Sequence, residues 1–352
     1  MISKDQIHEF SKRFAIDEFT IMREYIQVVF LGALYGLKES HKIYFKGGTA
    51  MRLLLKSGRF SEDLDFTSEL NVKELDLVVN RAVKKTNLLI PDVSIKRTDE
   101  KKMSYTGILS YHPAGIKYAL NIHLDFSLRE KPETSQDSVL LTDFPLASPP
   151  VIRHMNWPEI LAEKIRAFVY RSKGRDIYDL WFLLIKGIDL DWEMINRKTK
   201  FYKISTSLED VLRRVRDFDD KKLKNDMGKF LPAHDRGLVV HLKKMTTKEL
   251  MTRYGFTVVT SENLDYTKIP GHSFPGTDPF INNIKQTTIF EIKRQDENSL
   301  VVKMKNSDDR KANAYIRAQS YNGVRELKII ETNADLFKGR SYDHLIHHIF
   351  KT

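Results

Sequence analysis

The chain reads KGGTAMRLLLKSGRFSEDLDF from Lys46 to Phe66, and this stretch is the most informative part of the sequence. A pair of glycines followed by a hydroxyl residue, Gly47, Gly48 and Thr49, leads into a short predicted helix. Glycines at the start of a helix let backbone N–H groups close on phosphate oxygens. Alternatively, the Thr49 hydroxyl caps this helix, which is compatible with a phosphate contact.

Two aspartates follow on a predicted strand. Asp63 and Asp65 are one residue apart, so their side chains share one face while Leu64 and Phe66 point to the other. Two carboxylates on one face repel each other unless a divalent cation lies between them, and Mg²⁺ prefers such hard oxygen ligands. The segment therefore predicts a nucleotide held by its phosphates beside a metal site. A plain pair of surface carboxylates is the alternative.

A third carboxylate lies in a second alternating stretch, Tyr118–Phe126. Its apolar residues occupy every second position, and Asp125 lies on the polar face with Asn121 and His123. Three aspartates on neighbouring strands would hold two metal ions, one activating a hydroxyl and one clamping a triphosphate. Alternatively, Asp125 only accepts hydrogen bonds at a strand end.

The predicted helix that begins near residue 158 carries an apolar stripe. Lys164 is four residues from both Ile160 and Phe168, so it lies on that stripe. A lysine that faces inward needs an anion, because unpaired burial is unfavourable. A bound triphosphate would supply one. Alternatively, Lys164 pairs with Glu163 or Glu159 and its ammonium reaches solvent.

Other charged residues also have two interpretations. Asp176 falls in the first turn of the next predicted helix, where it contacts a ligand or caps the helix. Arg59 binds phosphate or pairs with Glu62. Lys46 and Arg52 are predicted to be solvated or salt-bridged.

Two blocks of sequence together resemble a known family. FKGGTAMRLLL…RFSEDLDF, and EILAEKIRA from Glu159 followed by GRDIYDLW from Gly174, are similar to the nucleotidyltransferase fold superfamily. Within it they resemble the AbiEii/AbiGii-type toxin family of type IV toxin–antitoxin systems. Superfamily members carry a glycine turn, an Asp-x-Asp and a distant third acidic residue, which is Asp125 here. The family's Gly-Ser is Gly48-Thr49 in this chain, which keeps the hydroxyl.

The resemblance implies an α/β (α+β) fold with a mixed sheet, a helical C-terminal half and a small β-rich terminal region. It implies transfer of a nucleoside monophosphate from an NTP to an acceptor hydroxyl, with the 3′ end of tRNA as first choice and pyrophosphate as product. The expected cofactor is Mg²⁺, as two ions, or Mn²⁺, and the expected partner is a cognate antitoxin encoded by a neighbouring gene. The resemblance implies that Asp63, Asp65 and Asp125 bind the metal. It implies that the nucleotide is bound by Gly47, Gly48, Thr49, Arg59 and Lys164. The implied catalytic residues are the three aspartates together with Lys164 and Asp176.

Two alternatives come from other classes of protein. The same site would modify a protein side chain or a small alcohol, or it would bind an NTP without chemistry as an interaction module. The presence of all three aspartates argues against a degenerate enzyme.

Composition limits the class further. The 352 residues are enough for two or three units. The absence of cysteine excludes disulfides and thiolate zinc sites. No stretch approaches the ~20 apolar residues of a membrane span, and the start Met1-Ile-Ser-Lys is unlike a signal peptide. A cytoplasmic protein is expected.

The net charge is +11, from 58 Lys and Arg against 47 Asp and Glu. Basic runs occur at Arg213-Arg214-Val-Arg216, Lys221-Lys222-Leu-Lys224 and Lys243-Lys244. Such runs are commonly solvated helix faces. Beside a nucleotidyltransferase site they also fit the phosphate backbone of an RNA partner.

Three domains are expected: a catalytic core over 1–150, a helical domain completing the nucleotide site over 151–254, and a small α/β region of unknown role over 255–352. The first has predicted helices at 1–20, 24–35 and 72–85, and predicted strands at 42–45, 92–98, 104–111 and 118–127. Four prolines make 129–150 a predicted crossing loop.

Beyond residue 255, Pro-Gly breaks indicate an irregular connection. An antiparallel meander is predicted at 287–294, 299–305, 312–320 and 326–331, with a hairpin turn at Asn322-Gly323. A closing helix is predicted at 342–350. Its His344 and His348 are predicted to be a solvated face rather than a metal site.

Overall fold

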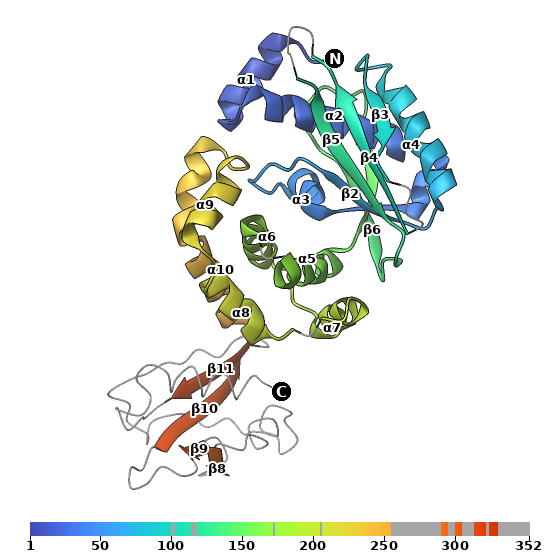
Figure 1. Cartoon of the computed structure of the whole chain (residues 1–352). Coiled ribbons are helices and arrows are strands. Elements are labelled where there is room, and N and C mark those ends of the chain that lie inside the picture. The colour runs from blue at the N-terminus through green and yellow to red at the C-terminus, as the bar shows by residue number, and fades with distance from the viewer. Residues whose placement is uncertain are drawn as a thin grey trace. The chain divides into compact units, whose positions relative to one another are not determined.

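The computed structural model describes residues 1–99, 103–113, 118–171, 173–204 and 206–254, and four strands beyond them. The chain divides into two units. The first comprises Met1–Lys203 and Phe218–Leu242, and the second comprises Ile204–Asp217 and Lys243–Thr352. Figure 1 shows the large sheet with its helices in the first unit and the small sheet in the second.

The described helices are α1 (Lys4–Phe14), α2 (Glu18–Tyr35), α3 (Gly47–Leu55), α4 (Val72–Thr86), α5 (Trp157–Arg171), α6 (Gly174–Ile185), α7 (Trp192–Phe201), α8 (Leu208–Arg216), α9 (Asp220–Gly228) and α10 (Val239–Tyr254), with 3-10 helices at Lys38–Lys42 and Ala233–Leu238. The strands are β1 (Ile43–Lys46), β2 (Leu64–Ser68), β3 (Ser94–Arg97), β4 (Ser104–Tyr111), β5 (Leu120–Ser127), β6 (Ser135–Val139), β7 (Val151–Met155), β8 (Phe290–Arg294), β9 (Leu300–Met304), β10 (Asn313–Tyr321) and β11 (Val324–Ile329).

The first unit is built on a mixed sheet of seven strands in the order β3-β4-β5-β2-β1-β7-β6. The pairs β2–β5 and β1–β7 are parallel. The remaining neighbours are antiparallel. The expected α/β fold with a mixed sheet is confirmed.

A row of aromatic side chains fixes the register of the four central strands. Phe66 lies opposite Phe45 and Phe126, and Phe126 lies opposite Tyr105. Successive ring centroids across this row are 5.3, 4.4 and 5.7 Å apart, and all four side chains are buried. A slip by one residue would turn this row to the other face of the sheet. The register therefore also fixes which residues share the opposite face.

Helices α2 and α4 cover the aromatic face and close one hydrophobic core with it (Figure 1). In α2 the apolar residues are buried almost all round, as expected for a helix in the middle of a core. In α4 one face is buried, and Asn71 begins the helix with a capping box to Glu74. Helix α5 packs against α6 and α7, and α6 packs against α9.

The expectation of a loop over 129–150 is wrong in part, because this stretch contains β6. Residues 135–139 read SQDSV, and β6 is the edge strand, paired only with β7. A polar edge strand lacks the apolar alternation by which strands are recognised in a sequence. Prolines flank it on both sides, which also favoured a loop.

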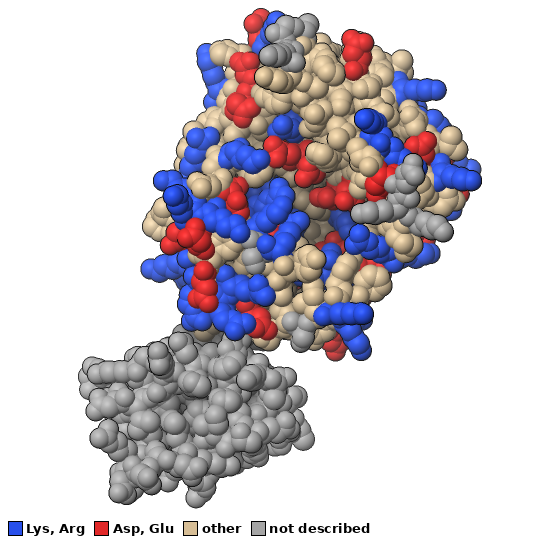
Figure 2. Space-filling model, in the orientation of Figure 1, with Lys and Arg blue, Asp and Glu red and all other residues tan. Residues whose placement is uncertain are grey.

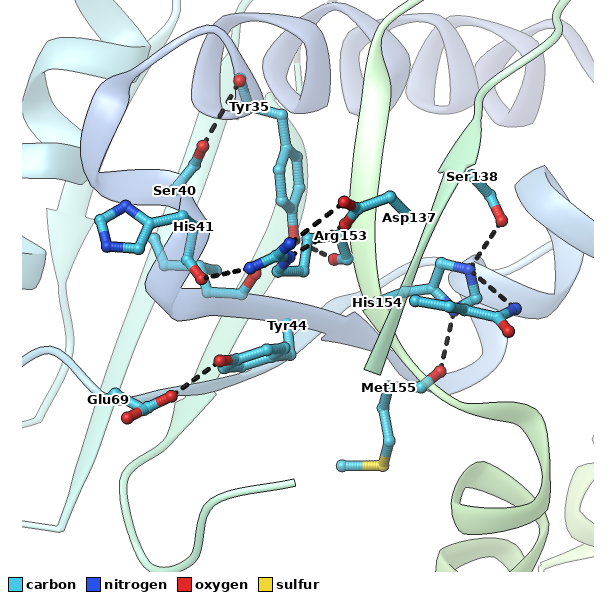
Figure 3. A network of polar contacts seen from close by, with 12 residues as sticks. Tyr35, Ser40, His41, Tyr44, Glu69, Asp137, Ser138, Arg153, His154 and Met155 are labelled. Atoms are coloured by element: carbon cyan, nitrogen blue, oxygen red, sulfur yellow. Dashed lines mark hydrogen bonds and ion pairs between the residues drawn. The ribbon is translucent and has the colours of Figure 1, made fainter. Parts of the chain in front are cut away.

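Polar contacts hold this edge in place (Figure 3). The Arg153 guanidinium lies 2.9 Å from Asp137, across the β6–β7 pair. The His154 ring is buried and its Nε2 lies 2.8 Å from the Ser138 hydroxyl, while Nδ1 donates to the Met155 carbonyl at 2.8 Å. Burial lowers the pKa of His154. The edge is therefore fixed by polar contacts where apolar residues are few.

The predicted helical region after residue 157 is confirmed by α5 to α10. In the second unit, β8 to β11 form an antiparallel sheet in chain order, which confirms the predicted meander. The predicted turn at 322–323 and the helix at 342–350, with His344 and His348, lie outside the described residues. Within the described residues, every helix is too short or too polar to cross a membrane.

Candidate active site

A cavity of about 430 Å³ opens on the sheet face opposite the aromatic row, which is within the usual size range of ligand pockets. Acidic and basic side chains border one another around a hollow in the first unit (Figure 2). The cavity is lined by Lys46, Gly47, Asp65, Asp99, Ser104, Thr106, Asp125, Ser127, Arg129, Ile160, Glu163, Lys164, Arg166, Ala167, Arg171 and Tyr202.

The sheet wall of the cavity carries two aspartates side by side. Asp65 on β2 is in register with Asp125 on β5, and these strands are parallel neighbours. Lys46 on β1 lies opposite Asp65, and Thr106 on β4 lies opposite Asp125. Neighbouring strands are about 4.8 Å apart. The sheet therefore brings the two predicted carboxylates together in the cavity.

Gly47 permits the close approach of α3 to Asp65. Its φ is +80°, and a Cβ at this position would lie 2.1 Å from the Asp65 Oδ2 atom. Any other residue would clash with the carboxylate, so the glycine places the first turn of α3 directly beside it. Gly48 is buried away from the cavity lining, where a Cβ would lie 2.4 Å from an Arg59 nitrogen.

Thr49 and Asp63 are not among the residues that line the cavity. Thr49 is fully buried and its hydroxyl donates to the Asp63 carbonyl, so it does not cap α3. Asp63 immediately precedes β2. Burial and then the charge of Asp65 raise the pKa of Asp63. Asp63 is thus electrostatically linked to the aspartate pair without lining the cavity.

The two in-register aspartates have the chemistry of a divalent-metal site. Burial, followed by the charge of Asp65, raises the pKa of Asp125. A cation between two such carboxylates would remove the repulsion. In the described parts of the chain, no group of three or more acidic or histidine side chains stands close enough together to hold a metal ion. The carboxylates of Asp65 and Asp125 thus match the hard oxygen donors that a divalent metal prefers.

The helix wall is organised by Asp179 on α6, which the sequence analysis missed. Its carboxylate accepts from Arg59 at 2.6 and 2.8 Å and lies 2.6 Å from the Lys164 ammonium. Asp179 is fully buried. Burial alone would raise the pKa of this carboxyl, but the two cations outweigh it and hold the pKa well below its usual range. Asp179 is three residues after Asp176, a helical spacing that was the available signal.

These contacts change two of the expected pairings. Lys164 pairs with Asp179, not with Glu163 or Glu159, and it lines the cavity with a side chain that is 12% exposed. Arg59 also pairs with Asp179 instead of Glu62, and it lies outside the cavity lining.

Asp176 lies in the first turn of α6, as the sequence predicted, and it is fully buried there. It neither caps that helix nor lines the cavity. Instead it accepts from Arg171 at 2.8 and 3.1 Å, and Arg171 lines the cavity. Asp176 therefore orients a cation at the cavity.

Lys46 and Glu163 join the two walls. The Lys46 ammonium lies 3.0 Å from a Glu163 oxygen, as expected for a salt-bridged lysine. Burial disfavours the Glu163 carboxylate, but Lys46 and Arg166 outweigh this and lower its pKa. The pair connects β1 to α5 across 117 residues of sequence, so no local pattern could have predicted it.

Two solved structures are similar to this chain over most of their own length. The structure of JHP933 from Helicobacter pylori is similar at 21% identity, covering 67% of this chain and 94% of that chain with a TM-score of 0.41. MenT4, a nucleotidyltransferase toxin from Mycobacterium tuberculosis, is similar at 16% identity, covering 71% of this chain and 89% of that chain with a TM-score of 0.47. The comparison with curated proteins finds no match.

The family model described as nucleotidyl transferase AbiEii toxin, type IV TA system, matches residues 30–240. This range is more than half of the chain and contains every residue that lines the cavity. The chain therefore belongs to the AbiEii nucleotidyl transferase toxin family of type IV toxin–antitoxin systems.

Proposed function

We propose that the protein transfers a nucleoside monophosphate from an NTP to the 3′-terminal hydroxyl of tRNA, in an Mg²⁺-dependent reaction that releases pyrophosphate. Family membership makes it a toxin nucleotidyltransferase and implies a cognate antitoxin. The observation that carries the finer proposal is the pair Asp65 and Asp125, in register on parallel strands and facing Lys164 across one cavity.

The sheet wall would hold the metal. Asp65 and Asp125 supply carboxylate oxygens, and Mn²⁺ would be accepted by the same donors. When bound, the metal would polarise the phosphates and favour an attacking alkoxide. Asp125 would also accept the proton of the acceptor hydroxyl.

The helix wall would hold the triphosphate. Lys164, Arg171 and Arg129 bring cationic groups into the cavity. The first turn of α3 adds backbone N–H groups beside Asp65, where an anion is favoured. The acceptor oxygen would attack the α-phosphorus. The bond between the α-phosphorus and the oxygen that bridges it to the β-phosphorus would break, and pyrophosphate would leave. Charge stabilisation and positioning by these groups would supply most of the acceleration.

The basic excess of the chain supports an RNA acceptor. Arg213 and Arg216 on α8 and the three lysines of the run 221–224 on α9 are exposed. Exposed cations on helices suit a phosphate backbone, and the net charge is +11. In this proposal these helices bind RNA and the cavity performs the transfer.

The decisive experiment incubates the protein with each α-labelled NTP and total RNA, with Mg²⁺ or with EDTA, and then separates RNA from protein. The proposal expects label at the 3′ end of tRNA, and only with the metal. Asp65→Ala and Asp125→Asn should abolish labelling, since each removes one of the two metal-facing carboxylates. Asp5→Ala, on the exposed side of α1, is the matched control and should label normally.

Other outcomes would assign a different function to the same cavity. Label in protein would show that the acceptor is a side chain. Bound NTP without transfer to either fraction would make the protein an interaction module. Labelling by Asp65→Ala at the wild-type rate would contradict the proposed metal site.

A further inference from the structure

Two residues at the edge of the cavity form a stacked pair that the proposed transfer does not use. The Arg166 guanidinium on α5 lies 4.0 Å from the centroid of the Tyr202 ring, at the C-terminal end of α7. Both side chains line the same cavity as Asp65, Asp125 and Lys164. A planar cation stacked on an aromatic ring presents a flat surface with hydrogen-bond donors along its edge.

The position of Tyr202 is fixed by a buried ion network. Lys198, one turn earlier on α7, is 2% exposed, and its ammonium lies 2.6 Å from Glu159 on α5 and 3.0 Å from Glu130. Glu159 is fully buried and also accepts two backbone N–H groups at 3.0 and 3.1 Å. Breaking such a network is strongly unfavourable. Helix α7 therefore holds the Tyr202 ring against α5.

Arg166 retains hydrogen-bonding capacity. Among the described residues, its buried Nε atom has no hydrogen-bond acceptor. Its neighbour Glu163 directs both oxygens to Lys46, at 3.0 and 3.1 Å. A ligand in the cavity that Arg166 lines can supply acceptors to the terminal nitrogens of its guanidinium.

We propose that Arg166 and Tyr202 form the platform that receives the nucleobase of the NTP, and that Arg166 donates to acceptors on the edge of the base. This inference rests on the proposed function, because it needs an NTP in the cavity. A phosphate would use the charge of Arg166 but would gain nothing from the Tyr202 ring. A nucleobase uses both, through stacking and through edge hydrogen bonds.

The chemistry of Arg166 also predicts which bases are preferred. Guanine presents two adjacent acceptors, O6 and N7, and cytosine presents O2 and N3. In adenine the amino group lies beside both N7 and N1. It is a donor, so it cannot accept a hydrogen bond from a guanidinium. The pair should therefore favour GTP and CTP over ATP.

The test measures binding of each NTP, and separately of inorganic tripolyphosphate, by calorimetry with Mg²⁺. Tyr202→Ala should weaken GTP and CTP binding about tenfold through the lost stacking, and Tyr202→Phe should bind like the wild type. Tripolyphosphate affinity should be unchanged in both variants, because tripolyphosphate has no base to stack on the Tyr202 ring. Tyr170→Ala, 79% exposed on α5 and outside the cavity lining, is the matched control.

Arg166→Gln should remove the preference for GTP and CTP over ATP while leaving stacking on Tyr202. Equal NTP affinity in Tyr202→Ala and the wild type would overturn the platform and leave the proposed function standing. A parallel loss of tripolyphosphate affinity would also overturn it, since the effect would then not depend on the base. A wild-type protein that binds tripolyphosphate but shows no added affinity for any NTP would overturn the platform alone, whereas a wild-type protein that binds no NTP would contradict both proposals.

Discussion

The carboxylates on the two sides of the cavity differ in how the surrounding charges shift their pKa. On the helix wall, Asp179 is surrounded by Arg59 and Lys164, and these cations lower its pKa despite complete burial. On the sheet wall, Asp65 and Asp125 are in register with each other, and burial with mutual repulsion raises the pKa of Asp125. The helix wall is electrostatically satisfied by the fold. On the sheet wall, Lys46 and Arg129 oppose the increase in the Asp125 pKa but do not outweigh burial and the charge of Asp65.

This contrast separates stability from function. A compensated buried carboxylate stabilises the packing of the elements it joins, and its loss leaves unpaired cations. An uncompensated pair reduces stability, and such sites are typical of catalytic centres. Asp179 should therefore matter most for folding and Asp125 most for turnover.

Among the substitutions considered, Asp179→Ala should have the largest effect, and this effect is on stability. Arg59 and Lys164 would lose their buried partner, so the free energy of unfolding should fall by about 3–5 kcal/mol. Urea denaturation measures this. Asp137→Ala is the matched control, because Asp137 forms the same two-bond pair with Arg153 but is 47% exposed. Its loss should amount to at most about 1 kcal/mol. Equal losses in the two variants would contradict the structural role of Asp179.

Lys164→Ala should separate the two roles of the helix wall. Arg59 would still compensate Asp179, so stability should change little, while NTP affinity should fall about tenfold as one charge-assisted contact is lost. Lys164→Arg should restore binding only in part, because a forked guanidinium replaces a compact ammonium. Calorimetry measures the binding. Normal NTP affinity in both variants would remove Lys164 from the nucleotide site.

Asp125→Asn should raise the thermal stability in metal-free buffer at pH 7 while it abolishes turnover. A carboxyl whose pKa is raised in the folded state destabilises that state once it ionises, so removing its charge should raise Tm by a few degrees. The gain should shrink as the pH falls toward about 3.9, the ordinary aspartate value, because the wild-type carboxyl then takes up its proton. Melting curves at several pH values measure it.

Mg²⁺ provides the internal control for this prediction. The metal should stabilise the wild type and should stabilise Asp125→Asn less, since one ligand is missing. A constant difference in Tm from pH 7 to pH 4, or a variant less stable than the wild type at pH 7, would show that Asp125 is not under electrostatic stress.

The smallest effect is expected from charge outside the cavity. Replacing Arg213, Arg214 and Arg216 with Gln should weaken tRNA binding across sequences and flatten the dependence of affinity on salt, because fewer counterions are released. Filter binding over a range of salt concentrations measures the slope. NTP affinity should stay at the wild-type value, since none of the three arginines is among the residues that line the cavity. An unchanged slope would show that this run is only a solvated helix face.

The sequence alone located the sheet wall. Alternation around Asp65 and Asp125 is a local property, and the apolar residues flanking each aspartate became the aromatic row that sets the register. The inward position of Lys164 also followed from helical spacing on α5. Local periodicity was sufficient in these cases because burial on one side of a strand or helix determines what lies on the other.

Which charges pair with one another depends on long-range packing. Arg59 reaches Asp179 across 120 residues and Lys46 reaches Glu163 across 117, and several closer carboxylates were equally compatible with the sequence. The edge strand β6 was likewise hidden, because its polar residues depend on pairing with β7 rather than on a pattern of their own. Packing selects the partner of a charge from many candidates, whereas periodicity specifies only the face from which that charge projects.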